Sequence, residues 1–399
     1  MHEHQEPQSI RYVQPDFNKH KLARALQDVY ATRVDNPPRI AVVGDFCLDK
    51  YLYHYPALDE ASVETGLTAY QIRATRLFPG VGGTIASNLR RLGAQVECFG
   101  VIGNDGEGYD LRRALDRIGA KHDGIVVDDA LQTCAYVKPT SPISEDYDQS
   151  QLPAPEQTLW REENRIDIRN GAPIPSELIQ QMQERLLCKL DQLDAIIVSD
   201  QFPSRSTAVC TAEFRQFISD LGQARPDLFI LCDSRFFVND YRNVVVKCNE
   251  REALDAVEAE RAGLVRNETS NLTCSQVNQV EVLHAAETLA RRNRRPVLVT
   301  KGAQGSILLK DTTDSNEVSS DAETIDAIVV PAIPVAPPID ICGAGDATNA
   351  GFAFARTLGF PLQDAAYLAG VVSSITIKQL GVTGTASVDQ VLETLRKEY

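Results

Sequence analysis

Apolar stretches about as long as a β-strand recur along the chain, and longer amphipathic stretches separate them. Six of the apolar stretches read RIAVVGD, VECFGVIG, AIIVSD, LFILCD, VVVKCN and PVLVTKG, the first beginning at Arg39 and the last ending at Gly302. Helix-like stretches such as residues 85–94 and 178–193 lie between them. Continuously apolar strands that alternate with helices indicate a parallel sheet covered on both faces. The pattern therefore predicts an α/β fold with three layers.

Polar residues or glycine stand at the ends of several of these predicted strands. They are Asp45, Asp200, Asp233, Asn249 and Gly302. Open α/β sheets bind ligands beyond the carboxyl ends of their strands. We expect these five residues to line one crevice.

Two segments, residues 50–78 and 133–169, alternate polar and apolar residues as half-exposed strands do. They predict a small β lid over the crevice, with a face that carries Tyr51, Tyr53, Tyr70, Ile72, Tyr136 and Trp160. A small sheet cannot bury such a face alone. Either bound substrate with the core or the lid of a second copy can cover it, and we predict a homodimer with paired lids.

Composition narrows the class of protein. The formal net charge is -15, which argues against a nucleic-acid or anionic-membrane partner. No apolar run reaches the roughly 18 residues of a membrane span, and the N-terminus has no signal-like apolar stretch, so we expect a cytoplasmic protein. The nine cysteines are scattered and never spaced C-x-x-C, so neither a disulfide framework nor a zinc site is indicated.

The densest chemical signal is the stretch DICGAGDATNAG. Gly343, Ala344 and Gly345 precede Asp346, and an apolar helix follows. Small residues allow a ligand to approach the backbone, and a helix start presents free N–H groups and a partial positive charge. These features suit an anion, whereas a carboxylate there repels a phosphate unless it takes a proton from the attacking group. The alternative role of Asp346 is a helix N-cap.

Three further motifs are ambiguous when taken singly. The glycines around Gly80 can bind a ligand or form a tight helix entry. Thr300, Gly302 and Gly305 can lie near a ligand or form an ordinary hairpin turn. Asn249 and Glu252, three residues apart, can orient a hydrated magnesium ion or cap a helix.

The order of these motifs resembles that of the ribokinase/PfkB family of carbohydrate kinases. The resemblance rests on PGVGGTIASNLRRLGA through GVIGNDGEG, KCNEREA, VTKGAQG and DICGAGD, and it extends from Arg39 to the C-terminus. It implies a three-layer α/β/α ribokinase-like fold with a mainly parallel central sheet and a small β lid. Residues 39–399 would form the kinase domain, and residues 1–38 an N-terminal extension. Within the family, VVGDFCLDKYLY, LFILCDSR and IKQLGVTGTASVDQV are most similar to heptose 7-phosphate kinases.

The resemblance also implies roles for individual residues. Asp346 would be the general base, helped by the backbone of Gly343, Ala344 and Gly345. ATP would contact Thr300, Gly302, Gly305 and Asn249, and Asn249 with Glu252 would hold Mg²⁺ through water. The sugar or sugar phosphate would meet Asp45, Asp49, Gly80 and Thr84, with Asp45 favoured over Asp49. Lys138, Arg161 and Arg165 are candidates for a substrate phosphate, the alternative being solvated lid charges.

Three residues depart from the pattern of the resembled family. Val81 stands where glycine or lysine is common, Thr84 replaces a common asparagine, and Ile341 replaces a common threonine. No H-x-G-H-type nucleotidyltransferase motif is present, so only a kinase step is expected. The acceptor stays open between a sugar, a sugar phosphate and a nucleoside or other small alcohol. A ligand-binding homologue without catalysis is the alternative from a different class.

Overall fold

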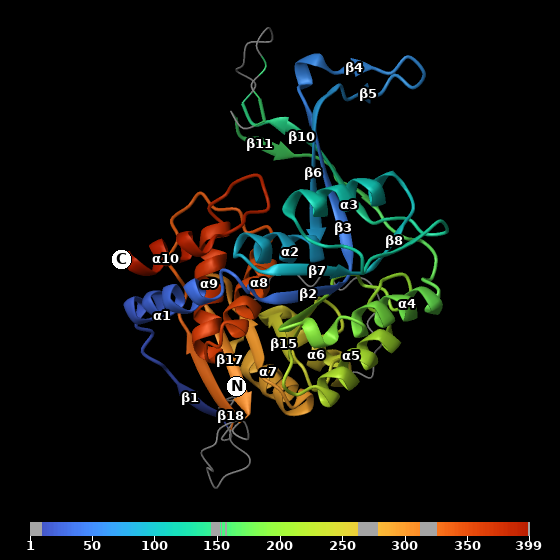
Figure 1. Ribbon diagram of the computed structural model, residues 1–399. Coiled ribbons are helices and arrows are strands. Elements are labelled where there is room, and N and C mark those ends of the chain that lie inside the picture. Colours follow the sequence, from blue (N-terminus) through green and yellow to red (C-terminus); the bar gives the residue numbers. More distant parts are fainter. Residues whose placement is uncertain are drawn as a thin grey trace, which may run out of the picture.

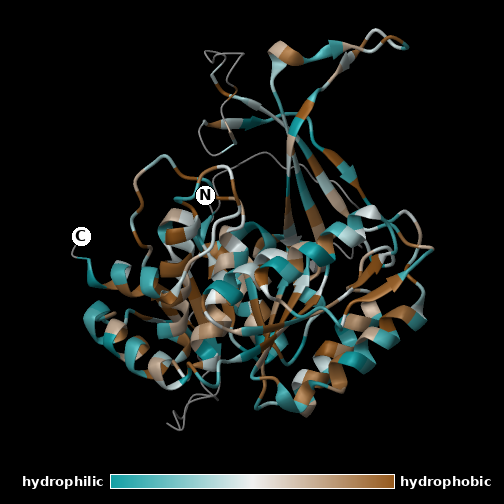
Figure 2. Ribbon diagram, turned by 45° about the horizontal axis from the view of Figure 1, so that its top comes forward, coloured by the Kyte–Doolittle hydropathy of each residue, from teal (hydrophilic) through white to brown (hydrophobic). Residues whose placement is uncertain are grey.

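The computed structural model describes residues 10–144, 152, 154–155, 158–261, 278–311 and 325–397. Its body is a sheet between two layers of helices, and a narrow lid projects from one end (Figure 1). The strands at the centre of the body are mostly hydrophobic, whereas the helices around them alternate hydrophobic and hydrophilic residues (Figure 2). The predicted three-layer α/β fold is confirmed.

The central sheet has nine strands within the described residues. In spatial order they are β1 (Ile10–Val13), β18 (Ile325–Val330), β17 (Ser306–Asp311), β16 (Val297–Thr300), β15 (Val245–Asn249), β14 (Phe229–Ser234), β13 (Ala195–Asp200), β2 (Arg39–Gly44) and β7 (Gln95–Phe99). Neighbouring strands are parallel except that β17 is antiparallel to both β16 and β18. The carboxyl ends of β2, β13, β14, β15 and β16 therefore meet at one edge of the sheet.

Each face of the sheet carries its own helices and its own buried hydrophobic cluster. One layer contains α1 (Lys19–Thr32), α2 (Gly82–Arg91), α3 (Gly106–Ile118), α8 (Ala344–Thr357), α9 (Leu362–Thr376) and α10 (Val388–Arg396). The other contains α4 (Ser176–Leu187), α5 (Ala212–Ala224), α6 (Glu250–Arg261) and α7 (Gln279–Asn293). The short helices are η1 (Pro56–Leu58), η2 (Leu190–Gln192), η3 (Val238–Asp240) and η4 (Gly302–Gln304). No helix among these described residues is long and apolar enough to cross a membrane.

The segment before residue 39 joins the body of the protein. The strand β1 pairs in parallel with β18, and the ion pair between Arg11 and Asp326 spans the two strands. Leu22, Ala23 and Leu26 of α1 are buried in the same cluster as α9 and α10. Residues 10–32 therefore pack on the body of the protein, next to the kinase domain that the resemblance places at residues 39–399.

The lid is a second sheet built from both predicted lid segments. It contains β3 (Phe46–His54), β6 (Ile72–Val81), β10 (Ala135–Pro142), β11 (Trp160–Glu162) and β12 (Ile166–Ile168), in the order β11-β10-β3-β6, with β12 also pairing with β10. A hairpin of β4 (Glu60–Ala61) and β5 (Thr68–Ala69) lies at its tip (Figure 1). The short strands β8 (Val101–Gly103) and β9 (Val126–Asp128) pair beside α3.

Candidate active site

The loop before α8 is shaped for the close approach of an anion. Gly343 has a φ of 75°, and a Cβ there would lie 2.7 Å from Cγ2 of Thr383. A Cβ on Gly345 would lie 3.0 Å from Nζ of Lys247. Within the described residues, the backbone amides of Gly343, Gly345 and Asp346 make no hydrogen bond. These free amides and the start of α8 offer a positive electrostatic site for a phosphoryl group.

Asp346 lies in the first turn of α8, beside this loop. Burial raises the pKa of its carboxyl group to about 7, and the charges of Asp233 and Asp49 act in the same direction. Lys247 and Arg235 oppose the increase. A carboxyl group with a pKa near the working pH can hold a proton and release it again, which is what a general base requires.

A buried polar cluster beneath the loop was not anticipated as a unit from the sequence. Nζ of Lys247 on β15 donates to Oδ2 of Asp233 at 3.0 Å, and Nδ2 of Asn349 on α8 donates to the same oxygen. Burial alone would lower the pKa of Lys247, but Asp233 and Glu252 raise it overall, so the ammonium stays charged. The signal available in the sequence was a lysine within the apolar run VVVKCN.

Asp49 enters the site from the lid strand β3. It is buried, and its Oδ1 lies 3.1 Å from Nζ of Lys138 on β10. A Cβ on Gly80 would lie 2.6 Å from Oδ2 of Asp49, so a side chain at this position would displace the carboxylate. Thr84, at the start of α2, lies near the loop before α8, with Cγ2 3.3 Å from the position of a Cβ on Gly343. The fold thus brings Asp49, Gly80, Thr84 and Gly343 together.

Asp45 has a structural role, because its carboxylate accepts hydrogen bonds from the loop after β13. Its Oδ2 accepts hydrogen bonds from the backbone amides of Gln201 and Phe202, and its Oδ1 accepts one from Val209. The side chain is buried, and burial, with a contribution from the charge of Asp200, raises its pKa to about 7. Asp45 therefore anchors the loop after β13, and both of its carboxylate oxygens already have backbone donors.

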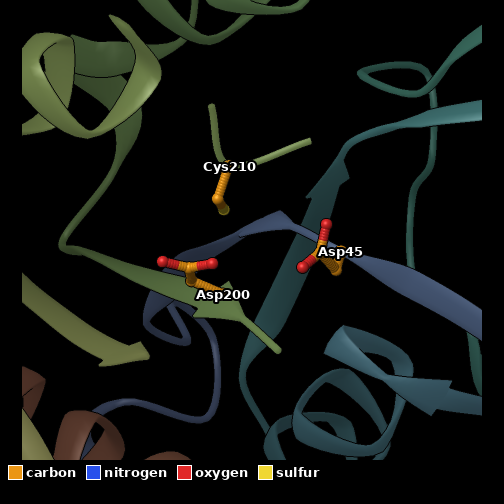
Figure 3. A group of neighbouring side chains, drawn as sticks. All are labelled: Asp45, Asp200 and Cys210. Carbon is orange, nitrogen blue, oxygen red and sulfur yellow. The ribbon is translucent and has the colours of Figure 1, made fainter. Parts of the chain in front are cut away.

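Asp45, Asp200 and Cys210 lie close enough together to suggest a metal-binding group, and Figure 3 shows both carboxylates beneath the thiol. Their atoms already have partners, however. Asp200 receives two hydrogen bonds from Arg215 and one each from Ser234 and Tyr241, and the thiol of Cys210 donates to Ser199. Arg215 already supplies a buried positive charge that pairs with Asp200. We therefore interpret the cluster as a structural ion-pair network and not as a metal site.

Val81, which departs from the resembled family pattern, has an unusual backbone conformation. It stands at the N-cap of α2 with a φ of 57° and a ψ of −116°. A β-branched residue seldom adopts a positive φ, and such a conformation costs about 1–3 kcal/mol. Contacts of Val81 with the buried cluster of Cys47, Phe202 and Ala208 help to hold this turn beside the site.

Asn249 and Glu252 form a reciprocal cap at the start of α6. The amide of Glu252 donates to Oδ1 of Asn249 at 2.8 Å, and the amide of Asn249 donates to Oε2 of Glu252 at 2.7 Å. The helix-capping alternative for this pair is therefore confirmed. Oε1 of Glu252 and the second lone pair on each bonded oxygen stay available for water, so the capped pair also fits a hydrated cation.

Thr300, Gly302 and Gly305 lie in the turn between β16 and β17, which are antiparallel. A Cβ on Gly305 would lie 2.2 Å from the carbonyl oxygen of Val330, so this glycine is required by packing. Gly302 has a φ of 54° and open space where its Cβ would be. The hairpin alternative is confirmed for the backbone, and Thr300 pairs in register with Asn249 of β15.

The three basic lid residues have different surroundings. Lys138 is buried between Asp49 and the hydroxyl of Tyr51. Arg165 is engaged with Asp167 through two hydrogen bonds. Arg161 is exposed on β11 and, within the described residues, has no side-chain partner. Arg161 is thus the one of these three that retains its full hydrogen-bonding capacity for a phosphate.

Comparisons with known proteins identify the family of the chain. A model of the pfkB family carbohydrate kinases matches residues 161–389, which is more than half of the chain. The chain is 25% identical over 364 residues to the bifunctional protein HldE of Citrifermentans bemidjiense, covering 89% of this chain and 63% of that protein. It is 26% identical over 342 residues to the bifunctional protein HldE of Caulobacter vibrioides, covering 86% and 60%. The chain therefore spans less than two thirds of the length of these relatives.

Solved structures with the same fold include two sugar kinases. Arabidopsis thaliana ribokinase complexed with ribose and ATP has a TM-score of 0.59 at 16% identity, with 91% of this chain and 100% of that chain covered. Phosphofructokinase-2 from Escherichia coli in complex with potassium has a TM-score of 0.63 at 16% identity, with 90% and 98% covered. At this level of identity the structural likeness establishes the ribokinase-like fold alone.

Proposed function

The chain belongs to the pfkB family of carbohydrate kinases, phosphotransferases that act on sugar hydroxyls, and we propose that it phosphorylates a sugar phosphate with Asp346 as general base. Heptose 7-phosphate is our first candidate acceptor, because of the similarity to bifunctional HldE proteins over most of this chain. The observation that carries the mechanism is the position of Asp346, a half-buried carboxyl group beside three free backbone amides.

In the proposed reaction, the acceptor hydroxyl oxygen attacks the γ-phosphorus of ATP. A new P–O bond forms, the bond from the γ-phosphorus to the bridging oxygen breaks, and ADP leaves with that electron pair. Asp346 takes the proton of the hydroxyl group, and the amides of Gly343 and Gly345 stabilise charge on the transferring phosphoryl group. The role of this chain is mainly to position the two substrates and to stabilise that charge.

We propose that the other site residues divide between the two substrates. Thr300, Gly302, Gly305 and Asn249 lie on the side of β15 and β16 and would contact ATP. Asn249 and Glu252 would hold Mg²⁺ through water, and the ion would neutralise charge on the nucleotide phosphates. Asp49, Gly80 and Thr84 would form the acceptor side, where a carboxylate can accept hydrogen bonds from vicinal hydroxyls. Arg161 is our candidate for the acceptor's own phosphate.

An acceptor panel tests the proposed function. ATP consumption would be measured with heptose 7-phosphate, the same heptose without its phosphate, other sugar phosphates, and nucleosides. We expect turnover with a sugar phosphate and at least about tenfold lower kcat/KM without that phosphate, because a charge-assisted hydrogen bond is lost. Preference for a nucleoside would favour the small-alcohol kinase, and no ATP consumption with any acceptor would favour a non-catalytic homologue.

We also propose that the lid pairs with a second copy of the chain. Two features of the lid support this pairing. The segment from β4 to the start of β6 carries four exposed apolar side chains, namely Val63, Leu67, Tyr70 and Ile72. In addition, β6 is an edge strand of the lid sheet and can pair with another strand. Tyr53 is 3% exposed against the ring of Trp160, so it belongs to the interior of the lid and not to an interface. The cytoplasmic location and the absence of nucleic-acid and membrane partners stay predictions from composition.

The paired lid predicts a specific mutational result. Ile72→Asp should shift the protein from dimer to monomer at micromolar concentration, because pairing of the lids would bury the new carboxylate in an apolar interface. It should also raise the KM of the acceptor. Val34→Asp, at an exposed apolar position after α1, is the matched control and should leave the dimer intact. Light scattering measures the mass. A fully active parent protein of monomer mass would contradict the proposal.

A further inference from the structure

Arg235 is a cation beside the candidate active site that the assignments above leave unused. It follows the end of β14, and its backbone amide donates to the carbonyl oxygen of Asp200 at 2.9 Å, which fixes the start of its side chain. The side chain is exposed, and the guanidinium group has no hydrogen bond or ion pair with any part of the chain that the structure describes. The nearby Lys247, in contrast, is buried and bound to Asp233.

The surroundings of Arg235 place it between the two halves of the site. Its charge lowers the pKa of both Asp346 and Glu252, although burial keeps each pKa raised overall. These carboxylates stand in the first turns of α8 and α6, and the charges of both act on the buried ammonium group of Lys247 on β15. The strand β14 lies next to β15, which carries Asn249 on the proposed nucleotide side. Arg235 therefore lies near both Asp346 and Glu252 but forms an ion pair with neither.

A free arginine in this position can bind a phosphate group. The guanidinium group presents five N–H donors in a planar fork that matches two oxygens of a phosphate. Lys247 cannot reach outward without breaking its buried ion pair, whereas Arg235 has no such pair to break. The free backbone amides at the start of α8, together with a free guanidinium group nearby, favour a group with several negative oxygens.

We propose that Arg235 binds the terminal phosphate of the donor nucleotide and stabilises the charge that develops on it during transfer. This inference rests on the proposed kinase function. It assigns the γ-phosphate contact to the exposed side chain that follows β14, while the start of α8 supplies fixed backbone amides. Arg235 is then a catalytic residue, because its guanidinium group touches the transferring group itself.

The test compares nucleotides that differ only in the terminal group. In Arg235→Gln, we expect the affinity for the non-hydrolysable analogue AMP-PNP to fall about tenfold or more, while the affinity for ADP stays within about twofold, as expected when one charge-assisted contact to the third phosphate is removed. We also expect kcat to fall by at least about tenfold. Arg235→Lys should recover part of the loss, because it restores the charge without the planar fork. Titration calorimetry measures both affinities.

Arg225→Gln is the matched control, because it makes the same change at a partly exposed arginine before the amino end of the same strand, paired there with Asp191 and Asp227. It should leave binding and turnover unchanged. Equal losses for ADP and AMP-PNP in Arg235→Gln, or no loss for either, would overturn the assignment to the terminal phosphate. If the parent protein bound neither nucleotide, the proposed kinase function would fail, and this inference would fail with it.

Discussion

Asp346→Asn is expected to lower kcat by at least about 10²-fold while nucleotide binding and the fold are retained. Asparagine has nearly the same shape but cannot accept the proton of the acceptor hydroxyl, so the help of a positioned base is lost. The fold should not suffer. Since burial raises the pKa of Asp346 to about 7, the charged form is disfavoured in the folded protein at neutral pH, and a neutral side chain removes that cost.

The same residue predicts the pH dependence of the parent enzyme. A base must be deprotonated to act, so kcat/KM should rise about tenfold per pH unit below pH 7 and level off above it, following the pKa of about 7. In Asp346→Asn, kcat/KM should no longer rise with pH below pH 7. Asp364→Asn, a change of the same type in the first turn of α9, is the control and should keep activity and profile. Near-normal turnover of Asp346→Asn with an unchanged profile would refute the assignment.

Arg215→Met is expected to lower the free energy of unfolding by about 3–5 kcal/mol. Arg215 is 1% exposed, and its Nε and Nη2 donate to the two carboxylate oxygens of Asp200 at 2.8 and 3.2 Å. Removing the cation leaves a buried carboxylate that keeps only the hydroxyl groups of Ser234 and Tyr241 as partners. Urea unfolding measures the difference.

Two further variants distinguish the destabilisation caused by the unpaired buried charge from that caused by lost packing. Asp200→Asn combined with Arg215→Met should recover a substantial part of the stability, since no unpaired charge is left. Arg205→Met breaks an exposed pair with Asp240 and should cost at most about 1 kcal/mol. The loss in Arg215→Met should also shrink on acidification, because protonation of Asp200 removes the unpaired charge. Equal stability of Arg215→Met and the double variant would contradict this account.

The class of fold could be predicted from local sequence because it depends on periodicity. Continuously apolar strands such as residues 195–200 and 228–233 are buried on both faces, and the helices between them have one apolar side. Burial of apolar area then leaves few arrangements other than a sheet between two helical layers. The alternating segments 50–78 and 133–169 predicted the lid for the same reason.

The assignment of residues 10–32 needed the tertiary structure. The segment is polar overall, and α1 buries only Leu22, Ala23 and Leu26. Its strand β1 pairs with β18, more than 300 residues later in the chain, with Ile10 opposite Ile325. Nothing in the local pattern of either strand specifies a partner at that distance, because strand pairing depends on the order of the whole sheet.

The sequence by itself determined which residue types were available for phosphoryl transfer: the glycines before Asp346, the pair Asn249 and Glu252, and acids at strand ends. Only the tertiary structure decided what each side chain does. Asp45 and Asp49 differ little in sequence context, yet Asp45 accepts hydrogen bonds from three backbone amides, whereas Asp49 pairs with Lys138 and lies against Gly80. The reason is physical: a carboxylate's role depends on which donors and charges the packed chain brings within reach, and those come from residues far away in the sequence.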